Sequence, residues 1–312
     1  MVPALVLTAG LATRLRPLSL VRAKAALPVA GVPLICRILR SLSAGGVADV
    51  VLNLHHLPHT LTRLIGDGEG LGLRVRYSWE VPVLGPAGGP RRAAPLLGPT
   101  FLVVNGDTLT DVDIGALVTH HRRSGALVTM AVVPNTQPDK YSGLSADREG
   151  VLTGFAKRGS PENAFHFLGV QAVESEAFAS VPENVPFETS TLYTSLIANR
   201  PGAIRLFNTS AEFFDIGTPA DYLDTSLLIG SREGYAAAGP SSVRIAPSAR
   251  VERSVLWDDV VVEAGTMLRE CVVTDGVRVP ADTSWHGVTI RVADGALAPG
   301  ERRVEDLAIA SL

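Results

Sequence analysis

Residues 5–31 read LVLTAGLATRLRPLSLVRAKAALPVAG, and this stretch decides the fold. A short apolar run is stopped by Ala9 and Gly10, as a buried strand is stopped by a turn. The cations that follow the turn are Arg14, Arg16 and Lys24. A strand, a turn of small residues and a helix aim backbone N–H groups at one point, where anions bind. The stretch therefore predicts a polyphosphate site held by backbone donors and cations.

Two common phosphate-binding motifs do not fit this stretch. A dinucleotide-binding loop needs G-x-G-x-x-G and an acidic residue about 20 positions later. A P-loop needs a lysine between glycine and Ser/Thr. The stretch has neither pattern. The phosphate-binding turn must therefore belong to another class of protein.

Size and composition narrow the function classes. The chain has 312 residues, enough for one large domain and a small one. The net charge is −3 with both signs scattered, which argues against a nucleic-acid partner. Apolar runs fall short of the ~18 residues of a membrane span, and the first residues lack the basic region of a signal peptide. Cys36 and Cys271 are distant in sequence and indicate reduced thiols, so we expect a cytoplasmic protein without a membrane partner.

Strands alternate with helices along most of the chain. Apolar or alternating runs predict strands at 4–8, 48–54, 73–79, 100–104, 126–133, 151–157, 166–173, 203–207 and 212–216. Helical spacing predicts helices at 33–46, 114–121 and 189–200, and one that starts at Thr218 with Pro219 in its first turn. This order predicts an α/β fold with a Rossmann-like mixed, mostly parallel sheet. The small and polar residues 231–242 are typical of a linker.

The pattern changes after this linker. Aliphatic or aromatic residues are spaced by six at Ile245, Val251 and Trp257, and again, after a slip of one residue, at Val262 and Leu268. A period of six is typical of a hexapeptide β-helix, and a short β-meander is the alternative. Such domains commonly bury aliphatic faces against copies of themselves, so we expect a homo-oligomer formed through the C-terminal region.

The motifs resemble those of the sugar-1-phosphate nucleotidyltransferases. LTAGLATRLRPLS and AKAALPVAGVPL are similar to the family signature G-G-x-G-T-R-L-x-P-L-T…P-K-P-L-L-P-V. WEVPVLGPAGG, FLVVNGDTL, GVLTGFAK and FFDIGTPADYL follow in the family's order, over residues 4 to 230. The C-terminal repeats resemble the mannose-1-phosphate guanylyltransferase-like branch. This resemblance implies a GT-A-like catalytic domain at 1–232 and a short left-handed β-helix at 241–312.

The resemblance also implies a reaction and its residues. An NTP and a sugar 1-phosphate would react with the help of Mg²⁺, a cation that favours carboxylates and phosphate oxygens. Arg14 would hold pyrophosphate, Lys24 the α-phosphate and Lys157 the sugar phosphate. The metal ligands would be Asp107 and Asp215, and Asp107 is counted with the three cations as catalytic. Nucleotide-binding residues would be Leu7, Ala9, Gly10, Leu11, Ala12, Thr13, Glu80 and Gly85, and sugar-phosphate-binding residues would be Gly143, Lys157 and Gly169.

Glu80 bears on the choice of base. It lies five residues before Gly85, where the family places a side chain against the base's pairing edge. Guanine offers two adjacent donors there, which a carboxylate accepts, whereas uracil offers one donor between carbonyls. Glu80 therefore favours GTP, with mannose 1-phosphate as the matching sugar. UTP remains the alternative, because uridylyltransferases occur in the same family.

Several residues depart from the family pattern. The replaced positions are Ala12 and Ser142 for glycine, Ala23 and Ala25 for proline, Pro86 for threonine and Ala156 for glutamate. If position 12 needs a positive φ, alanine costs on the order of 1 kcal/mol there. These departures leave a non-catalytic regulatory homologue as an alternative. A second alternative is a metal-dependent glycosyltransferase that uses Asp111 and Asp113 as a D-x-D motif, although these residues also suit the start of the next helix.

Overall fold

The computed structural model describes residues 2–160, 164–235 and 240–312, which form two compact units. Unit 1 consists of Met1–Gly10 and Cys36–Phe214, and unit 2 consists of Leu11–Ile35 and Asp215–Leu312. The chain leaves unit 1 soon after its first strand and returns to it within helix α1 (Leu34–Ala44). We call Leu11–Ile35 the signature segment, because it carries Arg14 and Lys24.

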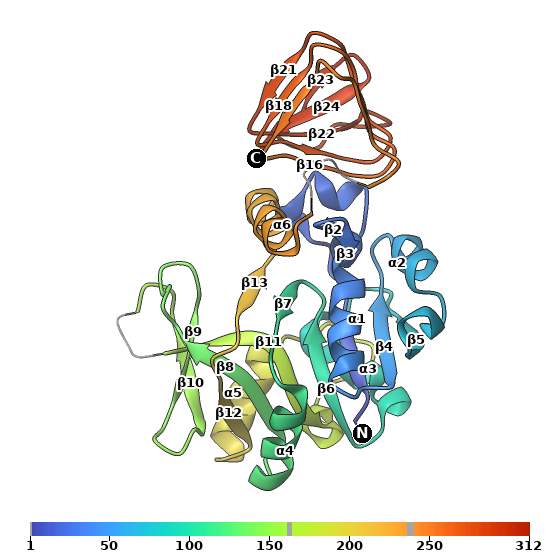
Figure 1. The fold of residues 1–312 in the computed structure, drawn as a ribbon. Helices are drawn as coiled ribbons and strands as arrows, with labels where there is room; N and C mark the ends of the chain where they lie inside the picture. Colours follow the sequence, from blue (N-terminus) through green and yellow to red (C-terminus); the bar gives the residue numbers. More distant parts are fainter. Residues whose placement is uncertain (1, 161–163, 236–239) are drawn as a thin grey trace. The chain divides into compact units, whose positions relative to one another are not determined.

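A nine-stranded mixed sheet forms the centre of unit 1 (Figure 1). Its parallel part has the order β6 (Thr100–Asn105), β1 (Ala4–Leu7), β4 (Asp49–Leu54), β5 (Arg74–Trp79). Beyond β6 lie the antiparallel β11 (Phe165–Glu174) and then β8 (Val128–Pro134), β9 (Gly143–Ala146), β10 (Leu152–Ala156) and β12 (Ile204–Asn208). Leu7 pairs with both Asn53 and Asn105. The carboxyl ends of β1, β4 and β6 therefore meet at one edge.

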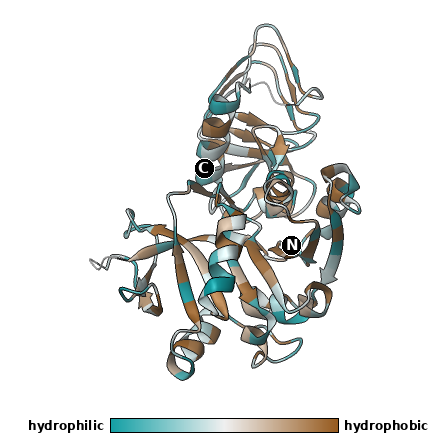
Figure 2. Ribbon diagram, turned by 60° about the horizontal axis from the view of Figure 1, so that its bottom comes forward, coloured by the Kyte–Doolittle hydropathy of each residue, from teal (hydrophilic) through white to brown (hydrophobic). Residues whose placement is uncertain are grey.

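The central strands form because their side chains are apolar on both faces. Leu5, Val51 and Val103 belong to one buried cluster, and the neighbouring residues inside these strands, such as Ala4 and Val6, are buried as well. Brown, the colour of hydrophobic residues, recurs along the strands of the sheet in Figure 2. Parallel strands that helices cover on both sides have this composition. The predicted mixed, mostly parallel α/β sheet is confirmed.

The helices of unit 1 include two that we did not predict. The predicted ones are α1, α4 (Ile114–Ser124) and α5 (Thr189–Asn199), and the additional ones are α2 (Pro58–Ile65) and α3 (Gly85–Leu97). Prolines at 90 and 95 lie inside α3, which is why the local sequence does not read as a helix. Its small residues pack closely instead, since Ala87, Gly88, Gly89 and Ala93 are all buried. The smaller elements are η4 (Glu69–Leu71), η5 (Ser175–Phe178) and the two paired strands β7 (Thr108–Thr110) and β13 (Phe213–Asp215).

Unit 2 begins with the signature segment, which is mostly irregular. Its elements are the 3₁₀ turns η1 (Thr13–Leu15), η2 (Leu18–Leu20) and η3 (Lys24–Ala26) and the short hairpin of β2 (Pro28–Val29) and β3 (Val32–Pro33). The later part of unit 2 starts with α6 (Pro219–Glu233), and Thr218 caps this helix by accepting a hydrogen bond from the Asp221 N–H. Helix α6 thus runs three residues into the predicted linker 231–242. Residues 236–239 of that stretch lie outside the described residues.

The C-terminal part of unit 2 is a β-helix with triangular coils (Figure 1). Three parallel ladders line it: β14 (Arg244–Ile245) with β17 (Val261–Val262) and β20 (Arg278–Val279); β15 (Arg250–Glu252) with β18 (Met267–Arg269) and β21 (Ser284–His286); β16 (Val255–Leu256) with β19 (Val272–Val273) and β22 (Val288–Val292). Hydrogen-bonded neighbours on adjacent coils, such as Asp259 and Ser242, are 17 residues apart. The expectation of a β-helix is confirmed.

The slip in the six-residue period falls earlier than predicted. Leu256, paired with Val273, occupies the core position that we assigned to Trp257. The aliphatic core positions are therefore spaced by six, five and six around each coil. Corner residues adopt positive φ at matching places on successive coils, for example 45° at Arg253, 52° at Glu270 and 64° at Gly287.

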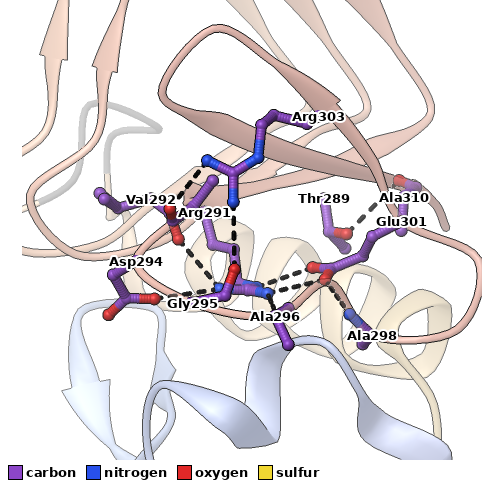
Figure 3. Close-up of polar contacts among 11 residues, drawn as sticks. Thr289, Arg291, Val292, Asp294, Gly295, Ala296, Ala298, Glu301, Arg303 and Ala310 are labelled. Carbon is purple, nitrogen blue, oxygen red and sulfur yellow. Dashed lines mark hydrogen bonds and ion pairs between the residues drawn. The ribbon is translucent and has the colours of Figure 1, made fainter.

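An antiparallel ladder and a buried ion pair close the β-helix (Figure 3). β22 pairs with β24 (Leu307–Ser311), which pairs with β23 (Arg302–Val304). Arg291 donates from Nε and Nη2 to the two Glu301 oxygens, at 2.7 Å each. The Arg291 side chain is 5% exposed and that of Glu301 is inaccessible. This bidentate pair fixes the loop between β22 and β23.

Candidate active site

The turn that we predicted to bind phosphates starts at Thr8 and Ala9, whose backbone N–H groups bond to Asn53 of the neighbouring strand β4. Thr8 N donates to Asn53 Oδ1 at 2.6 Å, and Ala9 N donates to the same oxygen at 3.3 Å. Asn53 is buried at the carboxyl end of β4. Ala9 is likewise buried, whereas Gly10 and Leu11 are exposed. Asn53 therefore shapes the start of the turn, and the exposed residues after Ala9 are the better placed for a ligand.

Our sequence reasoning missed Asn53. A polar residue inside the apolar run VVLNL was the available clue, because a buried amide needs partners. The Asn53 side chain donates from Nδ2 to Glu80 Oε1 at 2.8 Å. Thus one amide connects the backbone of the turn to the predicted base-reading residue.

Glu80 is buried, with 1% of its surface exposed. Its second oxygen accepts a hydrogen bond from Leu84 N at 2.8 Å, just before α3. Gly89 of α3 makes room for this arrangement, since a Cβ there would lie 2.8 Å from Glu80 Oε1 and 2.9 Å from Asn53 Nδ2. Each carboxylate oxygen therefore has one protein donor and keeps a lone pair for another. The assignment of Glu80 to the base stays a prediction.

Gly85 and Gly143 lie where a side chain would collide with protein atoms. Gly85 has φ +75°, and a Cβ there would lie 2.9 Å from the Phe187 carbonyl oxygen. A Cβ on Gly143 would lie 2.3 Å from the Cβ of Ala164. Packing alone therefore accounts for both glycines, and their predicted ligand contacts stay predictions.

Asp107 follows β6 and is half-buried. Gly106 N donates to the Leu7 carbonyl at 3.0 Å, and a Cβ on Gly106 would lie 2.4 Å from that oxygen. This contact ties the Asp107 turn to the end of β1. Gly169, with φ +78°, packs against Asn105, because a Cβ there would lie 3.1 Å from the Asn105 Cβ. Lys157, by contrast, is exposed after β10.

Unit 2 carries the other predicted charges. Arg14 and Thr13 are exposed in η1, and Lys24 is half-buried at the start of η3. A Cβ on Gly217 would lie 3.4 Å from Asp215 Oδ2 and 4.0 Å from Arg14 Nη2. The carboxylate and the guanidinium therefore both approach Gly217. Within unit 2, the signature segment thus brings a cation close to a predicted metal ligand.

Ala12 adopts a left-handed backbone conformation, with φ 46° and ψ 47°. Its carbonyl accepts hydrogen bonds from Leu15 N at 3.0 Å and from Ser19 Oγ at 2.9 Å. These contacts hold an alanine where the family pattern has glycine. Position 12 therefore has a positive φ, at which alanine costs on the order of 1 kcal/mol relative to glycine.

An aromatic group that we did not predict lies in unit 1. The His166 ring lies 4.2 Å from that of Tyr141 and 4.5 Å from that of Phe213, measured between centroids. Burial lowers the pKa of His166 to about 4, so the ring is neutral near pH 7. Tyr141 precedes Ser142 and Gly143, and Phe213 precedes Asp215 by two residues. These three side chains thus form a neutral, largely apolar group. In the sequence, two of them lie close to Gly143, which we assigned to the sugar phosphate, and to Asp215, which we assigned to the metal.

The residues available to a metal are compatible with Mg²⁺ bound jointly by protein and substrate. Among the described residues there is no group of three or more His, Cys, Asp or Glu that could hold a metal. Mg²⁺ commonly uses only one or two carboxylates and takes its other ligands from phosphates and water. The carboxylates of Asp107 and Asp215 are hard oxygen donors of this kind, and their assignment to Mg²⁺ stays a prediction.

The D-x-D sequence has a structural role. Asp113 Oδ1 accepts a hydrogen bond from Ala116 N at 2.8 Å and caps α4. Asp111 Oδ1 accepts one from Glu212 N at 2.7 Å. Asp113 therefore stabilises the start of its own helix, and Asp111 holds backbone that is 101 residues further along the chain. In the described parts of the chain, no helix is long and apolar enough to span a membrane.

Comparisons with known proteins agree with these motifs. Residues 3–231 match the family model described as nucleotidyl transferase. A mannose-1-phosphate guanylyltransferase from Mycobacterium tuberculosis is 30% identical over 293 residues, which cover 90% of this chain and 82% of that protein. A UTP–glucose-1-phosphate uridylyltransferase from Synechocystis is 26% identical over 338 residues, with 97% of this chain and 86% of that protein covered.

A solved structure shares the fold. The crystal structure of HddC from Yersinia pseudotuberculosis matches with a TM-score of 0.64 and 21% identity, over 73% of this chain and all of that chain. The family model covers well over half of the present sequence, and the M. tuberculosis protein is similar along most of its length. The chain therefore belongs to the nucleotidyl transferase family, as a sugar-1-phosphate nucleotidyltransferase.

Proposed function

We propose that the enzyme transfers the guanylyl group of GTP to mannose 1-phosphate, which yields GDP-mannose and pyrophosphate. The observation that carries this proposal is the 30% identity, over 90% of the chain, to a protein named for that reaction. The Glu80 carboxylate supports the choice of guanine, because it can accept from the N1–H and 2-amino donors of that base.

In this proposal the sugar phosphate oxygen attacks the α-phosphorus of the nucleotide, and pyrophosphate leaves. A phosphate monoester is largely dianionic near pH 7, since its second pKa is about 6, so it needs no general base. The protein must hold two anions that repel each other and stabilise the charge of the transition state. Arg14 holds the leaving pyrophosphate, Lys24 contacts the α-phosphate and Lys157 binds the sugar phosphate.

Asp107 and Asp215 would hold Mg²⁺, whose positive charge would offset that of the phosphates. Gly10, Leu11 and Thr13 are exposed and offer the turn's remaining backbone groups to the nucleotide. We further propose that the enzyme acts in the cytoplasm and assembles as a homo-oligomer through residues 241–312, with residues 1–232 as the catalytic domain.

The main alternative is UTP as the nucleotide. The similarity to the Synechocystis uridylyltransferase covers 97% of the chain and favours this possibility. Uracil would present carbonyl oxygens to Glu80, so the lone pairs that Asn53 and Leu84 leave free would face other acceptors, which is unfavourable. GTP therefore stays the first choice.

A thermal-shift panel tests the base, with GTP, UTP, dTTP, ATP and CTP each added with Mg²⁺. We expect GTP to raise the melting temperature most. Pyrophosphate release should then be measured with that nucleotide and with mannose 1-phosphate or glucose 1-phosphate. Stabilisation by UTP without stabilisation by GTP would contradict the guanine assignment, and pyrophosphate release with glucose 1-phosphate alone would contradict the sugar.

A further inference from the structure

Lys24 lies between two points at which unit 2 anchors the signature segment. Two residues before it, Arg22 reaches the β-helix. Four residues after it, the Pro28 carbonyl accepts a hydrogen bond from the Tyr222 hydroxyl of α6. The backbone between these points is the single turn η3, closed by Ala26 N to Ala23 O at 2.7 Å and by Leu27 N to Lys24 O at 3.2 Å. So short a turn has little stability of its own.

The first anchor is a bidentate ion pair. Arg22 donates from Nε to Asp275 Oδ2 at 2.7 Å and from Nη2 to Asp275 Oδ1 at 2.6 Å. Nη2 also pairs with Asp258. Asp258 and Asp275 are 17 residues apart on successive coils, and Asp258 N donates to Asp275 Oδ1. The Arg22 side chain is only 14% exposed, whereas the side chains of Asp275 and Asp258 are 31% and 48% exposed, so the ion pair is buried mainly on the side of the arginine.

The second anchor runs through Trp257. Its indole N–H donates to the Tyr222 hydroxyl at 2.9 Å, and this hydroxyl donates to the Pro28 carbonyl. Trp257 and Tyr222 are fully buried. The Arg22 guanidinium also stacks over the Trp257 ring, 5.3 Å from its centroid. One tryptophan therefore takes part in both anchors, and this role explains why it lies outside the β-helix core.

The sequence around Lys24 explains why such anchors are useful. Ala23 and Ala25 stand where the family signature has prolines. Ala23 has φ −55° and ψ 143°, a conformation that a proline would impose on the chain. Alanine imposes no such restriction, so the stiffness has to come from tertiary contacts.

We propose that Trp257, Asp258 and Asp275 of the β-helix are positioning residues that hold the Lys24 turn in its catalytic conformation. The inference rests on the proposed function, in which Lys24 contacts the α-phosphate. It gives the β-helix a direct part in the rate of the reaction, beside any part in assembly.

The kinetic test compares Asp275→Asn, Arg22→Met and the double variant with the wild type. We expect kcat to fall about 30-fold in Asp275→Asn, with KM for the sugar phosphate within threefold of wild type, because a mispositioned lysine loses transition-state contacts. The double variant should be no slower than Arg22→Met, since both changes break the same anchor.

The matched control is Glu301→Gln, which removes a charge from another buried ion pair of the β-helix. Its partner Arg291 makes no hydrogen bond to the signature segment in the described residues. This variant should lower the melting temperature while kcat stays within twofold of wild type. Equal losses of kcat in Glu301→Gln and Asp275→Asn, or near-normal kcat in Asp275→Asn, would overturn the proposal.

Hydrogen exchange gives a readout that does not depend on activity. The Ala26 and Leu27 amides should exchange at least tenfold faster in Asp275→Asn than in the wild type or Glu301→Gln. Unchanged exchange of these amides would overturn the positioning role. Absence of pyrophosphate release by the wild type with every nucleotide and sugar phosphate would instead refute the proposed function, and exchange would then decide the positioning role alone.

Discussion

The positive φ of Ala12 predicts a measurable loss of folding stability. With φ 46° it occupies a region that glycine enters without a steric penalty. Ala12→Gly should therefore raise the free energy of unfolding by about 0.5–1 kcal/mol, the strain relief exceeding the added freedom of the unfolded chain. Urea unfolding measures the change. The control is Ala23→Gly, where φ is −55° and the substitution should destabilise; a loss of stability in Ala12→Gly would contradict the strain.

Asp107 is a residue whose negative charge the proposed metal site requires. Asp107→Asn keeps the shape of the side chain and removes a charge from the proposed metal site. We expect kcat to fall at least ~100-fold while the fold survives, comparable to the loss of one main electrostatic contact. Asp113→Asn serves as the control, because asparagine is also a good N-cap and α4 should persist. Near-normal Mg²⁺-dependent turnover in Asp107→Asn would remove Asp107 from the site.

His166 predicts a particular pH dependence of stability. Its pKa is about 4 in the folded state, because burial disfavours the charged ring, and about 6.5 in an unfolded chain. The unfolded state therefore takes up a proton first as the pH falls, and the folded state loses stability between pH 6.5 and 4. His166→Gln should flatten this part of the stability profile. An NMR titration of the wild-type ring with a midpoint near 6.5 would contradict the prediction.

Helix α3 illustrates how an element can depend on a missing side chain. Gly89→Ala improves helix propensity, yet its Cβ would lie under 3.0 Å from Glu80 and Asn53. We expect the free energy of unfolding to fall by about 1–3 kcal/mol and KM for the nucleotide to rise, because the Asn53–Glu80 hydrogen bond must break or shift. Denaturant unfolding and steady-state kinetics measure both. The control Gly154→Ala has open space at its Cβ, and an equal effect there would refute the steric cause.

At the level of the whole chain, the β-helix should affect both assembly and activity. Deletion of Ser241–Leu312 removes Trp257, which contacts Tyr222 and Arg22 within unit 2. We expect the full-length chain to sediment as an oligomer of the 32.8 kDa chain, and the truncated chain to be smaller and less active. Analytical ultracentrifugation and pyrophosphate release are the measurements. Unchanged oligomeric state and turnover after the deletion would contradict both roles.

Much of the fold was predictable because its evidence is local. Apolar runs identified β1, β4 and β6, helical spacing identified α1 and α4, and the spacing of core residues identified the β-helix. These signals are continuous apolar runs or periods of 3.6 or six residues, and a short window is enough to detect them. The role of Asp113 as a helix cap was also predictable locally, because its carboxylate bonds to the backbone N–H only three residues further on. Helix α3 was missed for a local reason too, since its prolines argue against a helix.

The order of motifs along the chain also sufficed to predict the family, which the match to residues 3–231 confirms. The contacts that support the candidate site required the folded chain. Asn53 bonds to Thr8 across 45 positions, and Arg22 bonds to Asp275 across 253. No local period encodes such pairs, because they arise when strand ends meet at one sheet edge or when a segment packs on a distant coil. Local patterns thus determined the elements and the chemistry, and long-range packing determined which side chains hold that chemistry in place.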